Sequence, residues 1–138
     1  MSGKVIFYIL IILLTAFLIS VIIMFTREDP QEIYRRNSNL RVEVLNGCGV
    51  KRLAIKVANI LRQRGFNVVQ IGNARQTDFA ESVVIERSDE TGKNARYFAK
   101  RTGIKNIGMD VDPALHLDVT LIVGKDYKKI FPDVEEEF

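Results

Sequence analysis

The sequence predicts an α/β protein: one membrane-spanning helix, then a small two-layer α+β domain with a four- or five-stranded mixed sheet and two helices. Three observations predict it: an uncharged apolar run at residues 5–25, a strand–helix–glycine order that occurs twice, and an apolar strand near the C-terminus. The 138 residues leave room for one modest domain after the apolar run. We expect an N-terminal anchor at 1–26, a polar linker at 27–39, the domain at 40–131 and an acidic tail at 132–138.

The apolar run from Val5 to Phe25 contains no charge, and its only polar interruptions are Tyr8, Thr15 and Ser20. At about 1.5 Å per residue, a helix of this length spans a hydrocarbon core of about 30 Å. A signal peptide usually has a shorter apolar region and an A-x-A cleavage site, which this run lacks. The run therefore predicts an uncleaved anchor that crosses the lipid bilayer once.

The orientation of this anchor follows from the charges beside it. Lys4 and the amino terminus precede the run, and Arg27, Arg35 and Arg36 follow it. The positive-inside rule, applied to these groups, favours a cytoplasmic domain by a single charge.

The first strand of the domain is predicted from alternation. Leu40, Val42 and Val44 alternate with Arg41 and Glu43, a pattern typical of a strand with one buried and one solvent-facing side. A helix with one apolar stripe follows after the turn at residues 46–49 and stops at Gly65. The stripe consists of Val50, Leu53, Ala54, Val57, Ala58 and Leu61. The sequence "FNVVQIG" then supplies a second strand, which should be parallel to the first.

The same order returns in the second half of the domain. "SVVIER" indicates a strand, Ser88 or Asp89 can cap a helix, and "NARYFAKRTG" indicates that helix, ending at Gly103. A weak strand is expected at residues 105–108. "LDVTLIVG" at 117–124 is typical of a strand in the middle of a covered sheet. We expect a βαββαβ-like chain close to a split βαβ arrangement.

Charge and composition narrow the classes of function. Basic residues concentrate in 41–72 and acidic residues after Asp110, so a basic part could meet a polyanion or simply face solvent. One cysteine and one histidine, Cys48 and His116, give little support to a metal site or a thiol nucleophile. The sequence shows no evident pair of carboxylates for acid/base catalysis, and its basic residues lack the interleaved aromatic side chains on which single-stranded nucleic acid would stack. We expect neither an enzyme, nor a cofactor, nor a nucleic-acid partner.

The stretch "RVEVLNGCGVKRLAIKV" carries the one candidate site. Gly47 and Gly49 fit the start of G-x-G-x-x-G, but Arg52 occupies the third glycine position, and no P-loop pattern is present. A less specific anion or partner site at the start of the helix stays open. Its candidate residues are Asn46, Gly47, Gly49, Lys51, Arg52 and Lys56. The alternative is a tight corner in which Asn46 and a glycine supply positive φ angles.

The order of these motifs resembles a known family. The residues "VEVLNGCGVKRLAIKVANILRQRGFNVVQIGNA", "SVVIERSDETGKNARYFAKRTGI" and "DVTLIVGKDY" are similar to the LytR C-terminal domain of the LytR/CpsA/Psr cell-envelope group, over about Leu40 to Lys128. The resemblance implies a bacterial domain outside the cytoplasmic membrane, where it also occurs alone behind one transmembrane helix. In that group it usually follows a catalytic region that attaches glycopolymers to peptidoglycan. That region is missing here, so no catalytic residue carries over.

Together these features predict a membrane-anchored, non-catalytic binding module of the cell envelope, with a wall component or a wall-assembly protein as partner. The alternative is a cytoplasm-facing polyanion or nucleotide binder that uses the turn at residues 46–49 and the basic helix. The ligand, the partner and the oligomeric state stay open.

Overall fold

The computed structural model describes residues 2–135, and the chain divides into two units, one up to Ile33 and one from Tyr34 onward. In the first unit, helix α1 (Gly3–Thr26) has no buried residue. Two of its hydroxyls bond to the backbone of the helix itself: Thr15 donates to the carbonyl of Ile12, and Thr26 donates to that of Ile22. Among the described residues α1 alone is long and apolar enough to cross a membrane. These properties fit a single-pass anchor and are shared by signal sequences.

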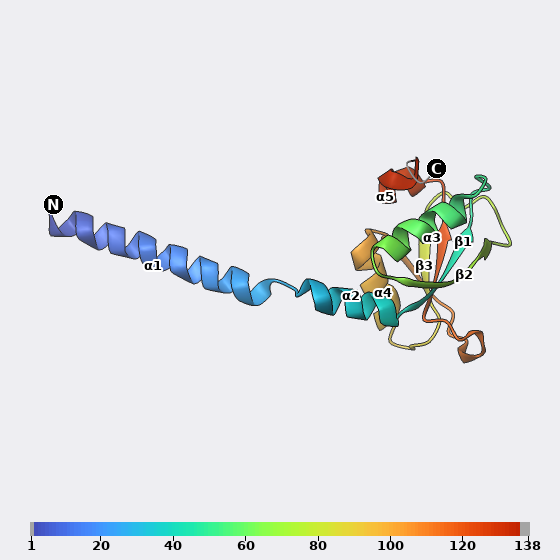
Figure 1. The fold of residues 1–138 in the computed structure, drawn as a ribbon, viewed down its shortest axis with the longest axis horizontal. Coiled ribbons are helices and arrows are strands. Elements are labelled where there is room, and N and C mark those ends of the chain that lie inside the picture. Colours follow the sequence, from blue (N-terminus) through green and yellow to red (C-terminus); the bar gives the residue numbers. More distant parts are fainter. Residues whose placement is uncertain (1, 136–138) are drawn as a thin grey trace. The chain divides into compact units, whose positions relative to one another are not determined.

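The second unit is built on a five-stranded mixed sheet (Figure 1). The strands are β1 (Arg41–Asn46), β2 (Asn67–Asn73), β3 (Val83–Glu86), β4 (Asn106–Met109) and β5 (Val119–Val123), in the order β2-β1-β5-β3-β4. β1 is parallel to β2 and β5, β3 is parallel to β4, and β3 is antiparallel to β5. The predicted α/β fold with a mixed sheet is confirmed, including its weak fourth strand.

The pairing of the strands differs from the split βαβ arrangement that we expected. β1 pairs directly with β2, and β3 pairs directly with β4, so neither βαβ unit has a strand inserted between its own two strands. The last strand, β5, lies instead between the β1–α3–β2 segment and the β3–α4–β4 segment. Strand order depends on contacts between distant segments, which local spacing does not specify.

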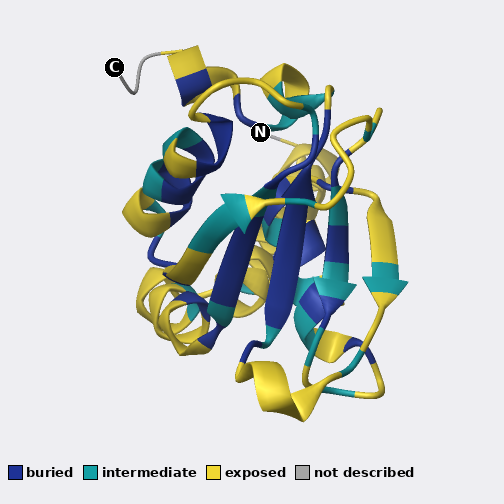
Figure 2. Cartoon of the chain, turned by 90° about the vertical axis from the view of Figure 1, so that its right-hand side faces the viewer, coloured by how far each residue is buried: buried dark blue, intermediate teal, exposed yellow. Residues whose placement is uncertain are grey.

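Two helices cover one face of the sheet. α3 (Leu53–Gln63) contacts β1 and β2, whereas α4 (Lys93–Thr102) contacts β3, β4 and β5. The two halves of this layer meet where the rings of Phe66 and Phe98 pack edge to face, 4.9 Å apart. The predicted stripe of α3 faces the core except for Val50, which precedes the helix and is exposed. Burial is deepest on the central strands β1 and β5 (Figure 2).

The expectation of a solvent-facing side on the first strand is wrong for Glu43. Glu43 is only 8% exposed because other side chains on the same face of the sheet, including Thr120, cover it. Its Oε2 accepts a hydrogen bond of 2.8 Å from Oγ1 of Thr120, the residue opposite it on β5.

The cap of α4 comes from the preceding strand, not from Ser88 or Asp89 as expected. Glu86 ends β3 and is fully buried. Its Oε1 accepts from the backbone N–H groups of Ser88 and Asp89 and from Nδ2 of Asn94, and its Oε2 accepts from the N–H of Ala95 at 2.8 Å. A carboxylate at this end of a helix satisfies donors that have no partner within the helix.

Both predicted flanks of the domain carry structure. Helix α2 (Pro30–Asn39) lies within the expected linker. Its buried Asn37 donates to the carbonyl of Arg64 at 2.9 Å and accepts from the hydroxyl of Tyr97 at 2.8 Å. The remaining elements are η1 (Pro113–Leu115), α5 (Tyr127–Ile130) and η2 (Pro132–Glu135). In the expected acidic tail Val134 is buried, and residues 136–138 lie outside the described residues.

Asp118 joins the starts of β5 and β1, and it makes stability depend on pH. Burial acts to raise the pKa of Asp118, but hydrogen bonds from Arg41 and Ser88 outweigh it and hold the pKa below the ordinary 3.8. A lowered carboxyl pKa stabilises the fold above about pH 4, and this contribution disappears as the pH falls through the folded-state pKa.

We therefore expect Asp118→Asn to lower stability at pH 7 and to flatten its decline below pH 4. Urea unfolding followed by circular dichroism between pH 2 and pH 7 measures both effects. Asp78→Asn, at an exposed carboxylate, is the control and should follow the wild-type curve. Parallel curves for wild type and Asp118→Asn would contradict the assignment.

Candidate functional site

The turn at residues 46–49 is organised by the side chain of Asn46. Its Oδ1 accepts from the backbone N–H groups of Cys48 and Gly49, both at 3.2 Å, and its Nδ2 donates to the carbonyl of Val50 at 2.6 Å. Gly49 has a positive φ of 74°, as a tight corner requires. The amides of Cys48 and Gly49, which could have met an anion, thus already point to Asn46.

Gly47 lies where three segments approach one another. Its N–H donates to the carbonyl of Val123 at 2.8 Å, and its carbonyl accepts from the N–H of Phe79 at 2.9 Å. A Cβ at this position would lie 2.5 Å from Cγ2 of Ile122 and 2.9 Å from the carbonyl oxygen of Val123. The glycine therefore allows the end of β1 to contact β5 and the segment of residues 74–82.

The six predicted site residues do not converge on one cavity. Asn46 and Arg52 line a shallow cavity of about 320 Å³, together with Ile71 and Asn73. The other four predicted residues, Gly47, Gly49, Lys51 and Lys56, are absent from its lining. Lys51 and Arg52 are exposed, and Lys56 is half-buried.

Segment 74–82 connects β2 to β3 and is fastened at three points. The N–H of Ala74 donates to the carbonyl of Asn46 at 2.9 Å, and the carbonyl of Phe79 accepts from the N–H of Lys125 at 2.9 Å. Oδ1 of Asp126 accepts from both the N–H and the hydroxyl of Ser82, at 2.9 and 2.7 Å. The two glycine-containing turns that follow β1 and β5 thus hold this segment.

Segment 74–82 forms one wall of a groove on the face of the sheet opposite α3 and α4. The groove has a volume of about 540 Å³. Leu45 and Ile122, neighbours across β1 and β5, form its floor, and residues around η1 form the second wall. It is lined by Leu45, Ala74, Arg75, Gln76, Phe79, Arg87, Asp110, Asp112, Leu115 and Ile122.

A chain of polar contacts runs beside the groove floor. Nε of Arg87 donates to Oγ1 of Thr120 at 3.0 Å, and Thr120 in turn donates to Glu43. The guanidinium of Arg87 also forms an ion pair with Asp110. Thr120 is fully buried, and its hydroxyl is already bonded to Arg87 and Glu43, so it is not available to a ligand. The arrangement fixes one wall of the groove.

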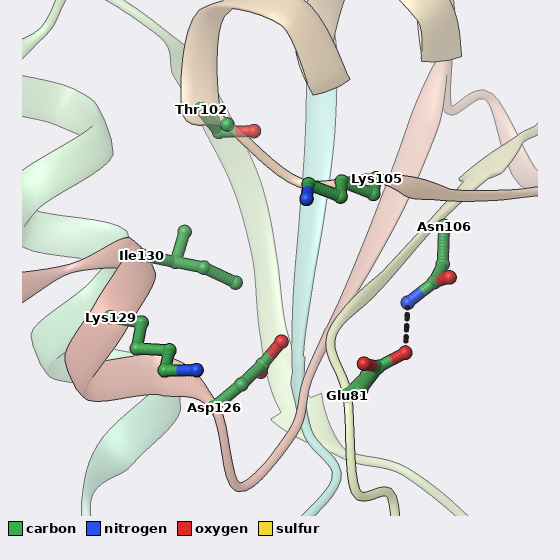
Figure 3. A pocket seen from close by; sticks show the side chains of 8 residues that line it. Glu81, Thr102, Lys105, Asn106, Asp126, Lys129 and Ile130 are labelled. Atoms are coloured by element: carbon green, nitrogen blue, oxygen red, sulfur yellow. Dashed lines mark hydrogen bonds between the residues drawn. The ribbon is translucent and has the colours of Figure 1, made fainter.

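A smaller cavity of about 380 Å³ lies between the end of α4 and α5 (Figure 3). Lys105 and Lys129 line it together with the carboxylates of Glu81 and Asp126. Glu81 accepts from Nδ2 of Asn106 at 3.0 Å, and Asp126 binds Ser82. Its carboxylates are thus engaged in holding segment 74–82 and β4. Within residues 2–135 no three His, Cys, Asp or Glu side chains are grouped to hold a metal ion.

The groove was not predicted from the sequence. Residues 74–81 had no assigned element, and Phe79 and Arg75 gave no signal of their own. The positions that hold the groove together, Asn46, Gly47 and Asp126, did belong to the recognised motifs.

The fold and groove define a small α/β module behind a single apolar helix. The model of the family described as LytR cell envelope-related transcriptional attenuator matches residues 39–127. The chain therefore belongs to the LytR C-terminal domain family, and its domain is related to the cell envelope. No curated protein and no solved structure matches the chain.

Proposed function

We propose that the protein is a single-pass membrane-anchored, non-catalytic binding module of the cell envelope, with its domain on the outer side of the cytoplasmic membrane. In this proposal the groove beside segment 74–82 binds a component of the cell wall or a protein of wall assembly. The observation that carries it is the groove itself, since the motifs that mark the family hold its wall in place. The apolar helix α1 supports the anchor.

The lining of the groove suits recognition of a partly polar ligand. Its floor is apolar, and its rim carries Arg75 and Arg87 beside Asp110 and Asp112, so both signs of charge are present. Concave apolar surfaces with a few polar groups are the usual form of binding sites. Sugar and peptide parts of a wall polymer offer both kinds of surface.

The alternative, a cytoplasmic polyanion or nucleotide binder at the turn of residues 46–49, has less support. A nucleotide site there would need backbone N–H groups directed at phosphate. Two of those groups donate to Asn46 instead.

Anchor retention and the side of the domain are tested together in intact cells. In a Cys48→Ser background, Thr77→Cys places a thiol on the exposed segment 74–82. We expect a membrane-impermeant thiol reagent to label it without permeabilisation, on a chain of full mass in the membrane fraction. Labelling only after permeabilisation would favour the cytoplasmic alternative, and loss of residues 1–26 would identify α1 as a signal sequence.

We expect Arg75→Glu to weaken co-sedimentation of the full chain with purified peptidoglycan sacculi by about ten-fold or more, which corresponds to about 1.4 kcal/mol. Reversal of a charge on the groove rim removes a favourable contact and adds repulsion there. Lys51→Glu makes the same charge change at the turn and should bind as wild type does. The reverse result, with loss only in Lys51→Glu, would place binding at the turn.

A further inference from the structure

Helix α4 presents a basic surface that the proposed groove does not use. Four cationic residues and one tyrosine occupy positions i, i+3, i+4, i+7 and i+8, which lie on one face of a helix. They are Lys93, Arg96, Tyr97, Lys100 and Arg101. The opposite face packs on the sheet through Ala95, Phe98, Ala99 and Thr102, all buried. No acidic residue occurs within α4.

The end of α2 adds a further cation to this surface. The guanidinium carbon of Arg36 lies 4.2 Å from the centre of the Tyr97 ring, and that of Arg101 lies 5.5 Å from the same centre. The hydroxyl of Tyr97 is held by Asn37. We call Arg36, Lys93, Arg96, Lys100 and Arg101 the basic stripe. Because α2 is docked through Asn37 and Tyr97, the stripe begins on the segment that follows the membrane helix.

A cavity of about 330 Å³ lies at one end of the stripe. Arg36 and Lys93 line it with Asn39 and Asn94. Because Nδ2 of Asn94 already donates to Glu86 and Ser88, the two cations and the amide of Asn39 are what the cavity offers to one phosphate group. Asp118 also lines this cavity, but its carboxylate is bound by Arg41 and Ser88. Lys93 pairs with Asp89 at 3.1 Å; Lys93 is exposed and Asp89 is half-buried, and an anion can replace this contact.

The length of chain between the apolar helix and the docked end of α2 is short. Residues 27–33 separate Thr26 from Tyr34, so eight steps of at most about 3.6 Å span less than about 30 Å. Residues from Pro30 onward are helical, which shortens the reach further. Anionic lipids attract basic groups within about one Debye length, about 10 Å. This short connection keeps the start of the domain within about 30 Å of the end of α1, so the stripe is able to reach the bilayer surface.

We propose that the basic stripe binds the headgroups of anionic phospholipids in the bilayer that holds α1. The inference rests on the proposed function in one respect, the retention of α1. Since α4 and the groove lie on opposite faces of the sheet, this contact turns the groove away from the membrane and leaves it open to a ligand.

The test uses the full chain in nanodiscs of phosphatidylcholine with and without phosphatidylglycerol, both containing a headgroup-attached quencher. In a Cys48→Ser background, a fluorophore is placed through Ser38→Cys beside the stripe or through Asp78→Cys on segment 74–82. We expect phosphatidylglycerol to increase quenching at Ser38→Cys at least about two-fold, and salt to reverse it. Quenching at Asp78→Cys should not rise.

The double variant Arg96→Glu with Lys100→Glu should abolish the increase. Lys51→Glu with Lys125→Glu makes the same change in net charge elsewhere and should keep it, provided that both variants show wild-type circular dichroism. Equal quenching in both lipid mixtures, or loss of the increase in both double variants, would overturn the proposal. Every nanodisc contains the full chain with α1, so such a result would not bear on whether α1 is retained in cells or on whether the groove binds a ligand. Those two claims are tested by the labelling and co-sedimentation experiments above.

Discussion

Glu86→Ala should cost the domain about 3 kcal/mol of stability, among the largest losses available to a single polar substitution. The buried N–H of Ala95 and the donors from Asp89 and Asn94 would lose their common acceptor. Each buried donor left without a partner costs about 1–3 kcal/mol, and the start of α4 would lose its cap. Thermal unfolding followed by circular dichroism should show a fall in Tm on the order of 10–20 °C.

Two variants separate this effect from a general effect of charge. Glu86→Gln keeps one acceptor but turns an amide N–H₂ toward a donor, so it should lie between Glu86→Ala and wild type. Glu90→Ala removes an exposed carboxylate nearby and should stay within about 0.5 kcal/mol of wild type. A loss in Glu86→Ala no larger than that in Glu90→Ala would mean that Glu86 does not hold α4.

Gly124→Ala should destabilise the domain by about 3 kcal/mol and open the groove. A Cβ on Gly124 would lie 2.5 Å from the carbonyl carbon of Glu81, 2.7 Å from its oxygen and 2.8 Å from the backbone nitrogen of Ser82. All three are main-chain atoms of segment 74–82, so relief requires movement of the segment rather than a change of rotamer. Urea unfolding gives the loss in free energy.

Hydrogen exchange gives the local part of the same prediction. The amides of Phe79 and Ser82 should exchange faster in Gly124→Ala than in wild type under conditions where both are folded. Gly108→Ala is the matched control, because the nearest atom to its Cβ would be Cγ1 of Ile85 at 3.7 Å. It should change stability by less than about 1 kcal/mol. Unchanged exchange at Phe79 in Gly124→Ala would show that the segment is held in another way.

Local periodicity was enough to predict the elements but not their partners. α3 and β5 were predicted because burial imposes a spacing that the sequence displays directly. The predicted solvent exposure of Glu43 was wrong, because an alternating pattern alone assigns every charged residue to the solvent-facing side of a strand. Whether such a residue is covered depends on Arg87 and Thr120, which lie far along the chain.

The candidate site shows the same limit. Asn46 and Gly47 stood out because turn chemistry is local, yet their carbonyls accept from the N–H groups of Ala74 and Phe79, which lie 28 and 32 residues further along the chain. The capping of α4 by Glu86 was missed for a related reason. The usual signal is a small polar residue directly before the helix, and here Gly92 occupies that position while a strand residue supplies the oxygens.

The central place of β5 governs when the domain can assemble. β5 is the last strand to leave the ribosome, yet β1 and β3 are joined only through it. Until residues 119–123 arrive, the two βαβ segments have exposed strand edges and share no sheet. The complete sheet therefore cannot form until nearly all of the described chain has been synthesised.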